Sequence, residues 1–367
     1  MLAGLNSKIN ERIAPFQRLS MKFKCYTGWE QLPASANTLF AKGKINSLFY
    51  SRPWFENLTA VALENDQAMV LACVLDENKV LALLPLMKCE GNIWYSLKHR
   101  YTSLYSLLLV DSDQLDIQQR VLACLAQGLS QLPIKGLLLE PVANNDSGLN
   151  ALQQSLESAG FNCDYTFRHY NWLYRVQGQS YEDYMETRPA RLRNTIARKK
   201  RKLEREYGYE IRLFKGNEVP QMMPDYYATH NASWKASEQY IDFFNGLVEG
   251  FSKQGWSRLA VLYVNGQPAA AQIWFVVHGK ANIFRLSYDE AWKQYSVGSI
   301  LTSFLMEYVI DTDNVEEIDF LTGNDTYKQD WMSDRRERFV LSCVKNIKAK
   351  GRLEFLTKFI KRVLRKL

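Results

Sequence analysis

The stretch LTGNDTYKQDWM, Leu321 to Met332, concentrates side chains that can do chemistry. It holds the carboxylate of Asp325, the phenol of Tyr327, the amine of Lys328 and the indole of Trp331. It directly follows EEIDFL, which has the pattern of a buried strand. A surface loop rarely contains a Trp, and a core segment rarely contains several charges. The stretch therefore predicts one wall of a pocket, with polar groups on an apolar support.

A second stretch, YDEAWKQYSVGSILT from Tyr288 to Thr302, predicts a helix that begins near Gly298. The first N–H groups of a helix and the positive end of its dipole can hold a phosphate. Ser296 or Ser299 could instead cap this helix, with no ligand present. If the preceding strand and EEIDFL are parallel neighbours, both stretches lie beyond the carboxyl ends of the strands, where α/β sheets bind ligands.

To bring these stretches together, the chain must supply a sheet, and its periodicity predicts one. The expected strands are two in 67–88 around a turn at Asp76–Asn78, then 92–97, 135–142, 171–177, 209–216, three in 257–290, 316–321 and 336–346. The expected helices are 115–132, 148–160, 188–207, 224–235, 240–255 and 298–311. Both halves follow the order strand, helices, three strands, helix, strand, helix, strand, so we expect an α/β fold of two similar halves.

The composition favours a globular protein of about two domains. The chain has 367 residues, of which 47% are hydrophobic and 23% charged. Its six Cys form no C-x-x-C pair and its four His are scattered, so we expect reduced thiols and no metal site. There is no targeting signal and no apolar run of roughly 18 residues. We expect a cytoplasmic protein, or one peripheral to the inner membrane face.

The net charge of +7 is concentrated in two segments. Residues 188–206 contribute +7 and residues 345–367 contribute +8, so the rest of the chain carries −8. Such local basic character indicates contact with a polyanion or an anionic membrane. The first segment has the alternative of a solvated connecting helix. The second has an apolar stripe opposite its Lys and Arg, typical of an interfacial helix, or of a helix docked on the protein's own sheet.

The long run AAAQIWFVVHGKANIFRLSYDEAWKQYSVGSILTSFLMEYVI, followed by IDFLTGNDTYKQDWM, resembles the GNAT-fold acyltransferases of the CelD/BioF-like branch related to the FemAB transferases. The basic RLRNTIARKKRKLERE occupies the place of that branch's arginine-rich helix, and the resemblance covers about 180–345. It implies an α/β fold of tandem GNAT-like domains, with mixed sheets flanked by helices and joined by a basic helix. The implied ranges are an N-terminal extension, 1–20, a degenerate GNAT-like domain, 21–178, a basic connecting helix, 179–208, a GNAT-like acyltransferase domain, 209–346, and a basic amphipathic C-terminal helix, 347–367.

The resemblance also implies a donor site for acyl-CoA or acetyl-CoA as co-substrate, without a metal. The phosphate loop of GNAT enzymes is Q/R-x-x-G-x-G/A, and Tyr295–Ile300 is the corresponding run. The central Gly is kept, while Tyr and Ile replace the leading Gln/Arg and the last small residue. Main-chain N–H groups need no particular side chain, so the expected donor-binding residues are Ser296, Val297, Gly298, Ser299 and Ile300.

The family's aromatic–Lys–x–x–aromatic run matches Tyr327, Lys328 and Trp331. By that analogy Lys328 contacts the donor or an acidic acceptor, and Tyr327 gives a proton to the leaving thiolate. Trp331 is expected to line the substrate pocket, together with Trp234 and Tyr288.

The attacking group must also lose a proton, which requires a base. The candidate bases are Asp289, Asp325 and His230, with structural alternatives for each. Asp289 could simply begin a loop, Asp325 could cap a short helix, and His230 could be a hydrogen-bonded structural residue.

These observations favour transfer of an acyl group from an acyl-CoA-type thioester to an amine or hydroxyl, of N-acetyltransferase type. The acceptor would belong to a polysaccharide, a lipid or a cell-surface precursor. One alternative is a FemAB-type transferase that uses aminoacyl-tRNA, with the basic helix contacting RNA. Another is a non-catalytic peripheral membrane protein. The basic helices also suit a membrane surface or an acyl carrier protein as partner.

Overall fold

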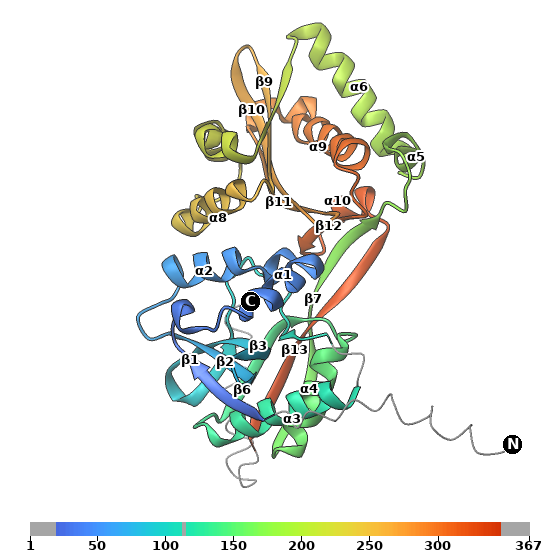
Figure 1. The fold of residues 1–367 in the computed structure, drawn as a ribbon. Coiled ribbons are helices and arrows are strands. Elements are labelled where there is room, and N and C mark those ends of the chain that lie inside the picture. The colour runs from blue at the N-terminus through green and yellow to red at the C-terminus, as the bar shows by residue number, and fades with distance from the viewer. Residues whose placement is uncertain (1–19, 112–114, 346–367) are drawn as a thin grey trace, which may run out of the picture.

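The computed structural model describes residues 20–111 and 115–345. The predicted N-terminal extension, apart from Ser20, and the predicted C-terminal helix, residues 347–367, lie outside the described residues. The described strands form one mixed sheet in the order β1-β2-β3-β4-β6-β13-β7-β12-β11-β10-β9-β8, with β5 beside β3. Figure 1 shows the first half of the chain at one end of this sheet and the second half at the other.

The first half contains most of the strands at one end of the sheet. Its strands are β1 Met21–Tyr26, β2 Ala68–Asp76, β3 Lys79–Lys88, β4 Ile93–Ser96, β5 Leu108–Leu109, β6 Gly136–Val142 and β7 Phe161–Arg175. Its helices are α1 Ala36–Asn46, α2 Arg52–Val61, α3 Leu115–Gln131 and α4 Ser147–Ser158.

The second half begins with two helices that precede its own strands. Its helices are α5 Tyr181–Glu186, α6 Ala190–Glu206, α7 Met223–Asn231, α8 Ile241–Lys253, α9 Val297–Glu307 and α10 Thr326–Trp331. Its strands are β8 Glu210–Lys215, β9 Ser257–Val264, β10 Gln267–Val277, β11 Lys280–Tyr288, β12 Glu317–Thr322 and β13 Asp334–Lys345. A short 3-10 segment, η5 Glu290–Tyr295, leads into α9.

Local chemistry explains where several elements begin. The side chain of Ser51 caps α2 by accepting the N–H of Trp54, and the side chain of Asp146 caps α4 by accepting the N–H of Leu149. Between β9 and β10, Asn265 and Gly266 have φ of 51° and 74°. Positive φ at both central residues suits a two-residue hairpin turn, as the Asn-Gly pair predicts.

Each half contains a pair of parallel strands joined through helices. In the first half β4 lies parallel to β6, and in the second β11 lies parallel to β12. The strand that follows each pair then crosses to the other half: β7 pairs with β12, and β13 pairs with β6. The predicted tandem GNAT-like α/β fold is confirmed, and the predicted domain ranges stay a prediction.

The two crossing strands also pair with each other. β7 and β13 are antiparallel from Leu173 opposite Asp334 to Phe161 opposite Lys345. Figure 1 shows them side by side, passing from one half of the molecule into the other. Since every main-chain group in this ladder needs its partner, the halves cannot separate without breaking strand pairing.

The halves also share a hydrophobic core. One cluster of buried residues runs from the first half to α7, α8 and the adjoining face of β9 and β10, while a second lies under α5, α6, α9 and α10. At the contact between halves, Phe243 of α8 lies edge-on to Trp54 of α2, with ring centroids 5.5 Å apart. Phe243 also stacks on His99, at 3.8 Å.

We expect Phe243→Ala to lower the free energy of unfolding by about 3–5 kcal/mol, because it leaves a cavity beside Trp54 in a shared core. Phe243 is 1% exposed. The matched control is Ile241→Ala on the same helix, since Ile241 is 46% exposed and should change stability by no more than about 0.5 kcal/mol. Urea unfolding followed by circular dichroism measures both. If both substitutions lowered the free energy of unfolding by the same small amount, the contact between Phe243 and Trp54 would not stabilise the two halves.

His99 makes the same contact sensitive to pH. Its side chain is 8% exposed, and Nδ1 accepts the N–H of Tyr101 at 3.3 Å. Burial, and then the positive charge of Arg285, lowers the pKa of His99 to about 4. The unfolded chain therefore binds more protons than the folded one between the ordinary pKa of about 6.5 and this lowered value. The free energy of unfolding must fall as the pH falls through this window.

We expect His99→Phe to lose less stability than the wild-type protein between about pH 7.5 and about pH 5, because an aromatic ring is kept and the titration is removed. Below about pH 6.5, the free energy of unfolding of the wild-type protein should fall more steeply than that of the variant, by at most about 1.4 kcal/mol per pH unit. Urea unfolding at both pH values measures it. A variant whose pH dependence parallels the wild-type protein would contradict a neutral buried His99.

Candidate active site between the ends of β11 and β12

β11 and β12 diverge before they end. Their parallel pairing extends from Lys280 opposite Glu317 to Asn282 opposite Asp319, and β11 then continues to Tyr288. On the other strand, Leu321 has a φ of 57° and its N–H bonds the side chain of Asp319 at 2.6 Å. This irregular backbone coincides with a register shift between Asp319 and Thr322 in the pairing of β12 with β7. The divergence leaves main-chain groups on both strands that need partners other than each other.

Lys328, in α10, is a hydrogen-bond donor to the main-chain carbonyls at the end of β12. Its Nζ donates to the carbonyl of Thr322 at 2.7 Å and to that of Phe320 at 3.2 Å. It also lies 3.7 Å from a carboxylate oxygen of Asp325. Lys328 is only 4% exposed, and burial lowers its pKa while Asp325 and Asp319 oppose that change. Its three N–H groups are thus directed at the end of β12 and at Asp325.

Lys235, in the loop after α7, supplies a partner on the β11 side. Its Nζ donates to the carbonyl of Leu286. The N–H of Asp289 donates to Ala269 of β10, so by the alternation of an antiparallel strand Leu286 directs its carbonyl away from β10, toward β12. One lysine therefore binds each of the two diverging strands, Lys235 the end of β11 and Lys328 the end of β12.

The start of α9 lies beside the same gap. Ser296 is the N-cap residue, with φ 54° and ψ 40°, and its side chain caps no helix N–H. The first amides of α9, those of Val297, Gly298 and Ser299, have no partner within the helix. This uncapped end offers N–H donors and a positive dipole end to an anion. The alternative that Ser296 caps this helix is not what the structure shows, so its side chain does not compete with a ligand for these donors.

Gly298 allows an aromatic ring to lie against the start of this helix. A Cβ at Gly298 would lie 3.1 Å from Cδ1 of Tyr288, closer than most contacts allow. Tyr288 in turn packs on Trp234, with ring centroids 4.6 Å apart. Trp234 is 55% exposed, which is unusual for an indole and suits the wall of a binding site. The structure thus brings Trp234, Tyr288 and the predicted donor-binding run together.

The departure from the GNAT loop pattern has a structural explanation at Tyr295. Its hydroxyl donates to Glu206 of α6 at 2.7 Å, and the ammonium of Lys202 lies 4.8 Å from its ring centre. Lys199 adds a hydrogen bond to the carbonyl of Gln294. The aromatic side chain at the leading position of the loop therefore holds the basic helix α6 beside η5 and α9.

The three predicted bases lie in different settings. Asp289 accepts the N–H of Ala291 at 2.9 Å and begins η5, and Asp325 begins α10 with its side chain mostly exposed. His230 is buried, with Nε2 3.2 Å from the carbonyl of Ala236 and Nδ1 3.1 Å from Ser287 Oγ. A carbonyl only accepts, so Nε2 carries the proton and Nδ1 accepts from Ser287. Burial lowers the pKa of His230, which favours its neutral form. All three stay predictions as catalytic bases.

The aromatic residues around Lys328 are placed differently from each other. Tyr327 is 44% exposed and lies edge-on to Phe320, with ring centroids 5.6 Å apart. Partial burial, and then the charge of Asp325, raises the pKa of Tyr327 above its ordinary value, so this phenol is a weaker acid than usual. Trp331 is buried in the core beneath α10, and its carbonyl accepts the hydroxyl of Tyr184 at 2.8 Å. Its role as a pocket wall stays a prediction.

Sequence reasoning missed a charged cluster near Lys235 that joins the two halves. Arg285 of β11 lies 3.2 Å from the carboxylate of Glu238 and 3.9 Å from the ring centre of Tyr101. Tyr101, in the loop after β4, donates its hydroxyl to Glu238. Lys235 was missed because the expected helix 224–235 ends in the structure at Asn231, which puts Lys235 on a loop. Its position next to Trp234 was the available signal.

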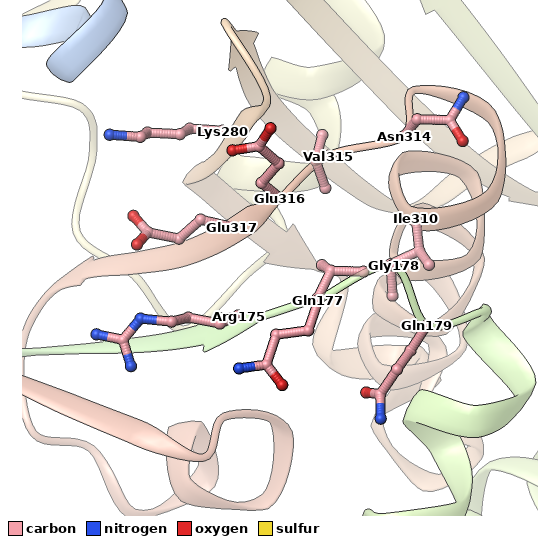
Figure 2. A pocket seen from close by; sticks show the side chains of 11 residues that line it. Arg175, Gln177, Gly178, Gln179, Lys280, Ile310, Asn314, Val315, Glu316 and Glu317 are labelled. Atoms are coloured by element: carbon pink, nitrogen blue, oxygen red, sulfur yellow. The ribbon is translucent and has the colours of Figure 1, made fainter.

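A cavity of about 480 Å³ lies at the opposite end of β12. Figure 2 shows its lining, with Arg175, Lys280 and Glu317 among the charged side chains. Arg175 pairs with Asp334 at 2.9 Å, and Glu317 pairs with Arg336 at 2.8 Å. Since these charges are already paired within the protein, the cavity is a less suitable reaction site than the gap. Among the described residues, no three His, Cys, Asp or Glu side chains are grouped as a metal site requires.

We expect Lys328→Met to lower the free energy of unfolding by about 2–4 kcal/mol, because two buried carbonyls lose their donor at about 1–3 kcal/mol each. Tyr327→Phe is the control, since the Tyr327 hydroxyl bonds no residue that the structure describes, and it should change stability by about 0.5 kcal/mol or less. Thermal and urea unfolding measure both variants. A Lys328→Met protein as stable as the control would show that the ammonium does not hold the end of β12.

The fold and this geometry define a class of protein, the α/β proteins of GNAT fold, and comparison with known proteins agrees. Residues 190–329, from the start of α6 into α10, match the family described as acetyltransferase (GNAT) domain. No curated protein matches the chain in sequence.

Solved structures extend the likeness beyond this domain. FemX is 10% identical over 83% of this chain and 95% of its own, with a TM-score of 0.60. A conserved protein of unknown function from Bacteroides thetaiotaomicron is 14% identical over 85% and 97%, at 0.53. The C-terminal DUF2156 domain of an Agrobacterium fabrum protein assigned as a lysylphosphatidylglycerol synthetase is 12% identical over 86% and 93%, at 0.51. The resemblance is confirmed at the level of fold: residues 190–329 match the acetyltransferase (GNAT) domain, and the chain as a whole has a fold similar to that of FemX.

Proposed function

We propose that the protein transfers an acyl group from a thioester such as acyl-CoA to an amine or hydroxyl, in the gap between β11 and β12. The observation that carries this proposal is the uncapped start of α9 at the mouth of that gap. The match to the acetyltransferase (GNAT) domain supports acyl transfer in general. The identity of the donor, N-acetyl transfer in particular, and the acceptor belong to the proposal.

The main-chain geometry suits a long donor with a phosphate at one end. The amides of Val297, Gly298 and Ser299 would receive the diphosphate, and Trp234 would cover the apolar part of the donor. An extended arm that contains amides would find unpaired main-chain groups along β11 after Asn282. Such an arm would lie in the gap as a strand lies between its neighbours, and its thioester would come to lie between the two lysines.

The acceptor would be a nucleophile that loses a proton as it attacks. Asp325, exposed and 3.7 Å from Lys328, is the predicted base with the most solvent access, and Asp289 and His230 are each held in hydrogen bonds. The acceptor class we propose is an amine or hydroxyl of a polysaccharide, lipid or cell-surface precursor. No helix that the structure describes is long and apolar enough to cross a bilayer.

Two other functions remain as alternatives to acyl transfer from a thioester. Transfer from aminoacyl-tRNA is implied by the FemAB resemblance, and the exposed Arg193, Arg198 and Arg201 of α6 pair with no carboxylate among the described residues. That alternative requires RNA binding that falls steeply with salt. A non-catalytic membrane role would depend on residues 347–367, which lie outside the described residues.

We expect Gly298→Asp to weaken acyl-CoA binding at least about 10-fold, because a carboxylate at the start of α9 repels the donor's phosphates. Gly298→Ala is the matched control: it adds the same Cβ against Tyr288 without a charge. Isothermal titration with acetyl-CoA and longer acyl-CoA measures both, alongside release of free thiol with amine acceptors. Absence of binding and of thiol release with every acyl-CoA would rule out this donor.

A further inference from the structure

We propose that Lys235 is the proton donor to the leaving sulfur of the acyl donor. This proposal rests on the proposed function, since it concerns the thiolate that acyl transfer releases. It differs from the expectation that Tyr327 donates this proton. Three features of the structure support Lys235: its place at the gap, its free N–H groups and its electrostatic surroundings.

The place of Lys235 follows from its hydrogen bond to β11. Its Nζ donates to Leu286, whose carbonyl faces the gap. Leu286 lies two residues before Tyr288, whose ring packs on Gly298 at the start of α9. The ammonium is therefore held between the site proposed for the donor's phosphates and the divergent ends of the strands. A thioester in the gap would lie beside it.

The hydrogen-bond inventory distinguishes the two lysines of the gap. A lysine ammonium has three N–H groups. Those of Lys328 are directed at Phe320, Thr322 and Asp325. Nζ of Lys235 has one described hydrogen bond, to the carbonyl of Leu286, and it also lies over the face of the Trp234 ring, 5.4 Å from the ring centre. Lys235 thus keeps N–H groups that can turn toward a ligand, whereas Lys328 holds the protein's own backbone.

The charges around Lys235 come from several elements. They are Arg285 of β11, Glu238 of its own loop, Asp325 before α10, Lys328 within α10 and His230 of α7. Burial, and then Arg285, lowers the pKa of Lys235 to about 8, against the opposing effect of Glu238 and Asp325. A cysteine thiol has an ordinary pKa of about 8.5, and a simple alkyl thiol is a weaker acid than that. An acid with the pKa of Lys235 is therefore protonated near neutral pH and can still give its proton to the leaving thiolate. The raised pKa of Tyr327 makes that phenol a poorer match.

The step balances without any further reactant. The acceptor's nitrogen or oxygen attacks the thioester carbonyl carbon, and the new C–N or C–O bond forms. The tetrahedral intermediate collapses, the C–S bond breaks, and the sulfur takes a proton from Nζ of Lys235. The proton that the acceptor loses passes to solvent or to the base, and Lys235 regains a proton from solvent after the thiol leaves.

The test compares two leaving groups in the full-length protein. With acetyl-CoA as donor, Lys235→Met should lower kcat by about 10²–10⁴-fold, with KM for acetyl-CoA changed less than about 3-fold. With an acetyl thioester of an aryl thiol, whose thiolate leaves without protonation, the same variant should lose less than about 10-fold. Lys235→Arg keeps a cation but cannot release a proton, so it should resemble Lys235→Met with acetyl-CoA. Lys253→Met, on the exposed end of α8, is the control and should leave both rates unchanged.

The pH dependence gives a second readout. In the wild-type protein kcat with acetyl-CoA should fall above about pH 8, as the acid loses its proton, and this limb should be absent from Lys235→Met. Equal losses with both donors, or an unchanged alkaline limb, would overturn the assignment and leave Lys235 a structural residue. A wild-type protein that releases no thiol from any acyl-CoA would instead overturn the proposed function, so the two failures are distinguishable. Circular dichroism of each variant confirms that it folds.

Discussion

The divergence of β11 and β12 after Asn282 and Asp319 is the constraint on which the rest of the candidate site depends. A parallel pair that separates leaves carbonyl and N–H groups without partners, and buried main-chain groups must be satisfied. Here two lysines and the turn at Leu321 meet part of that need. The carbonyl and N–H groups that still have no partner can bind a ligand that contains amides like those of a main chain. A site of this kind needs few catalytic side chains, because much of its chemistry is positioning.

The exchange of β7 and β13 supports the strand on one side of that gap. β12 has β7 as its other neighbour, and β7 is anchored along its length by β13. The end of β12 is held from the first half as well, since the N–H of Gly323 donates to Tyr170 of β7. Tyr101 reaches Glu238 from the loop after β4. The first half therefore has a physical part in the site, as a support for strands and loops of the second half, even though the matched GNAT domain lies in residues 190–329.

Several interpretations of single residues changed once neighbours were known. Gly298 was expected for the approach of a phosphate, and the structure adds the ring of Tyr288 as a reason for a missing side chain. Tyr295 looked like a weakened donor loop, yet it bonds Glu206 and so holds the basic helix in place. Lys328 was expected to face a ligand, and its described bonds go to the protein's own carbonyls. In each case the residue type could contact either a ligand or another part of the protein. Only the fold shows which of these contacts forms.

The sequence by itself determined the class of fold, the two similar halves and the stretches that meet at the strand ends. It could do so because apolar periodicity and Gly, Asn and Ser turn signals are local, and because both stretches directly follow strands. It did not predict β1, α1, α2 or α5, or the first part of β7, whose residues 161–170 carry polar side chains and alternate weakly. Only the tertiary structure decided that β7 and β13 cross between halves, because strand pairing joins residues far apart in the chain. It also decided that Lys235 stands at the gap, since a lysine's hydrogen-bond partner and surrounding charges come from other elements.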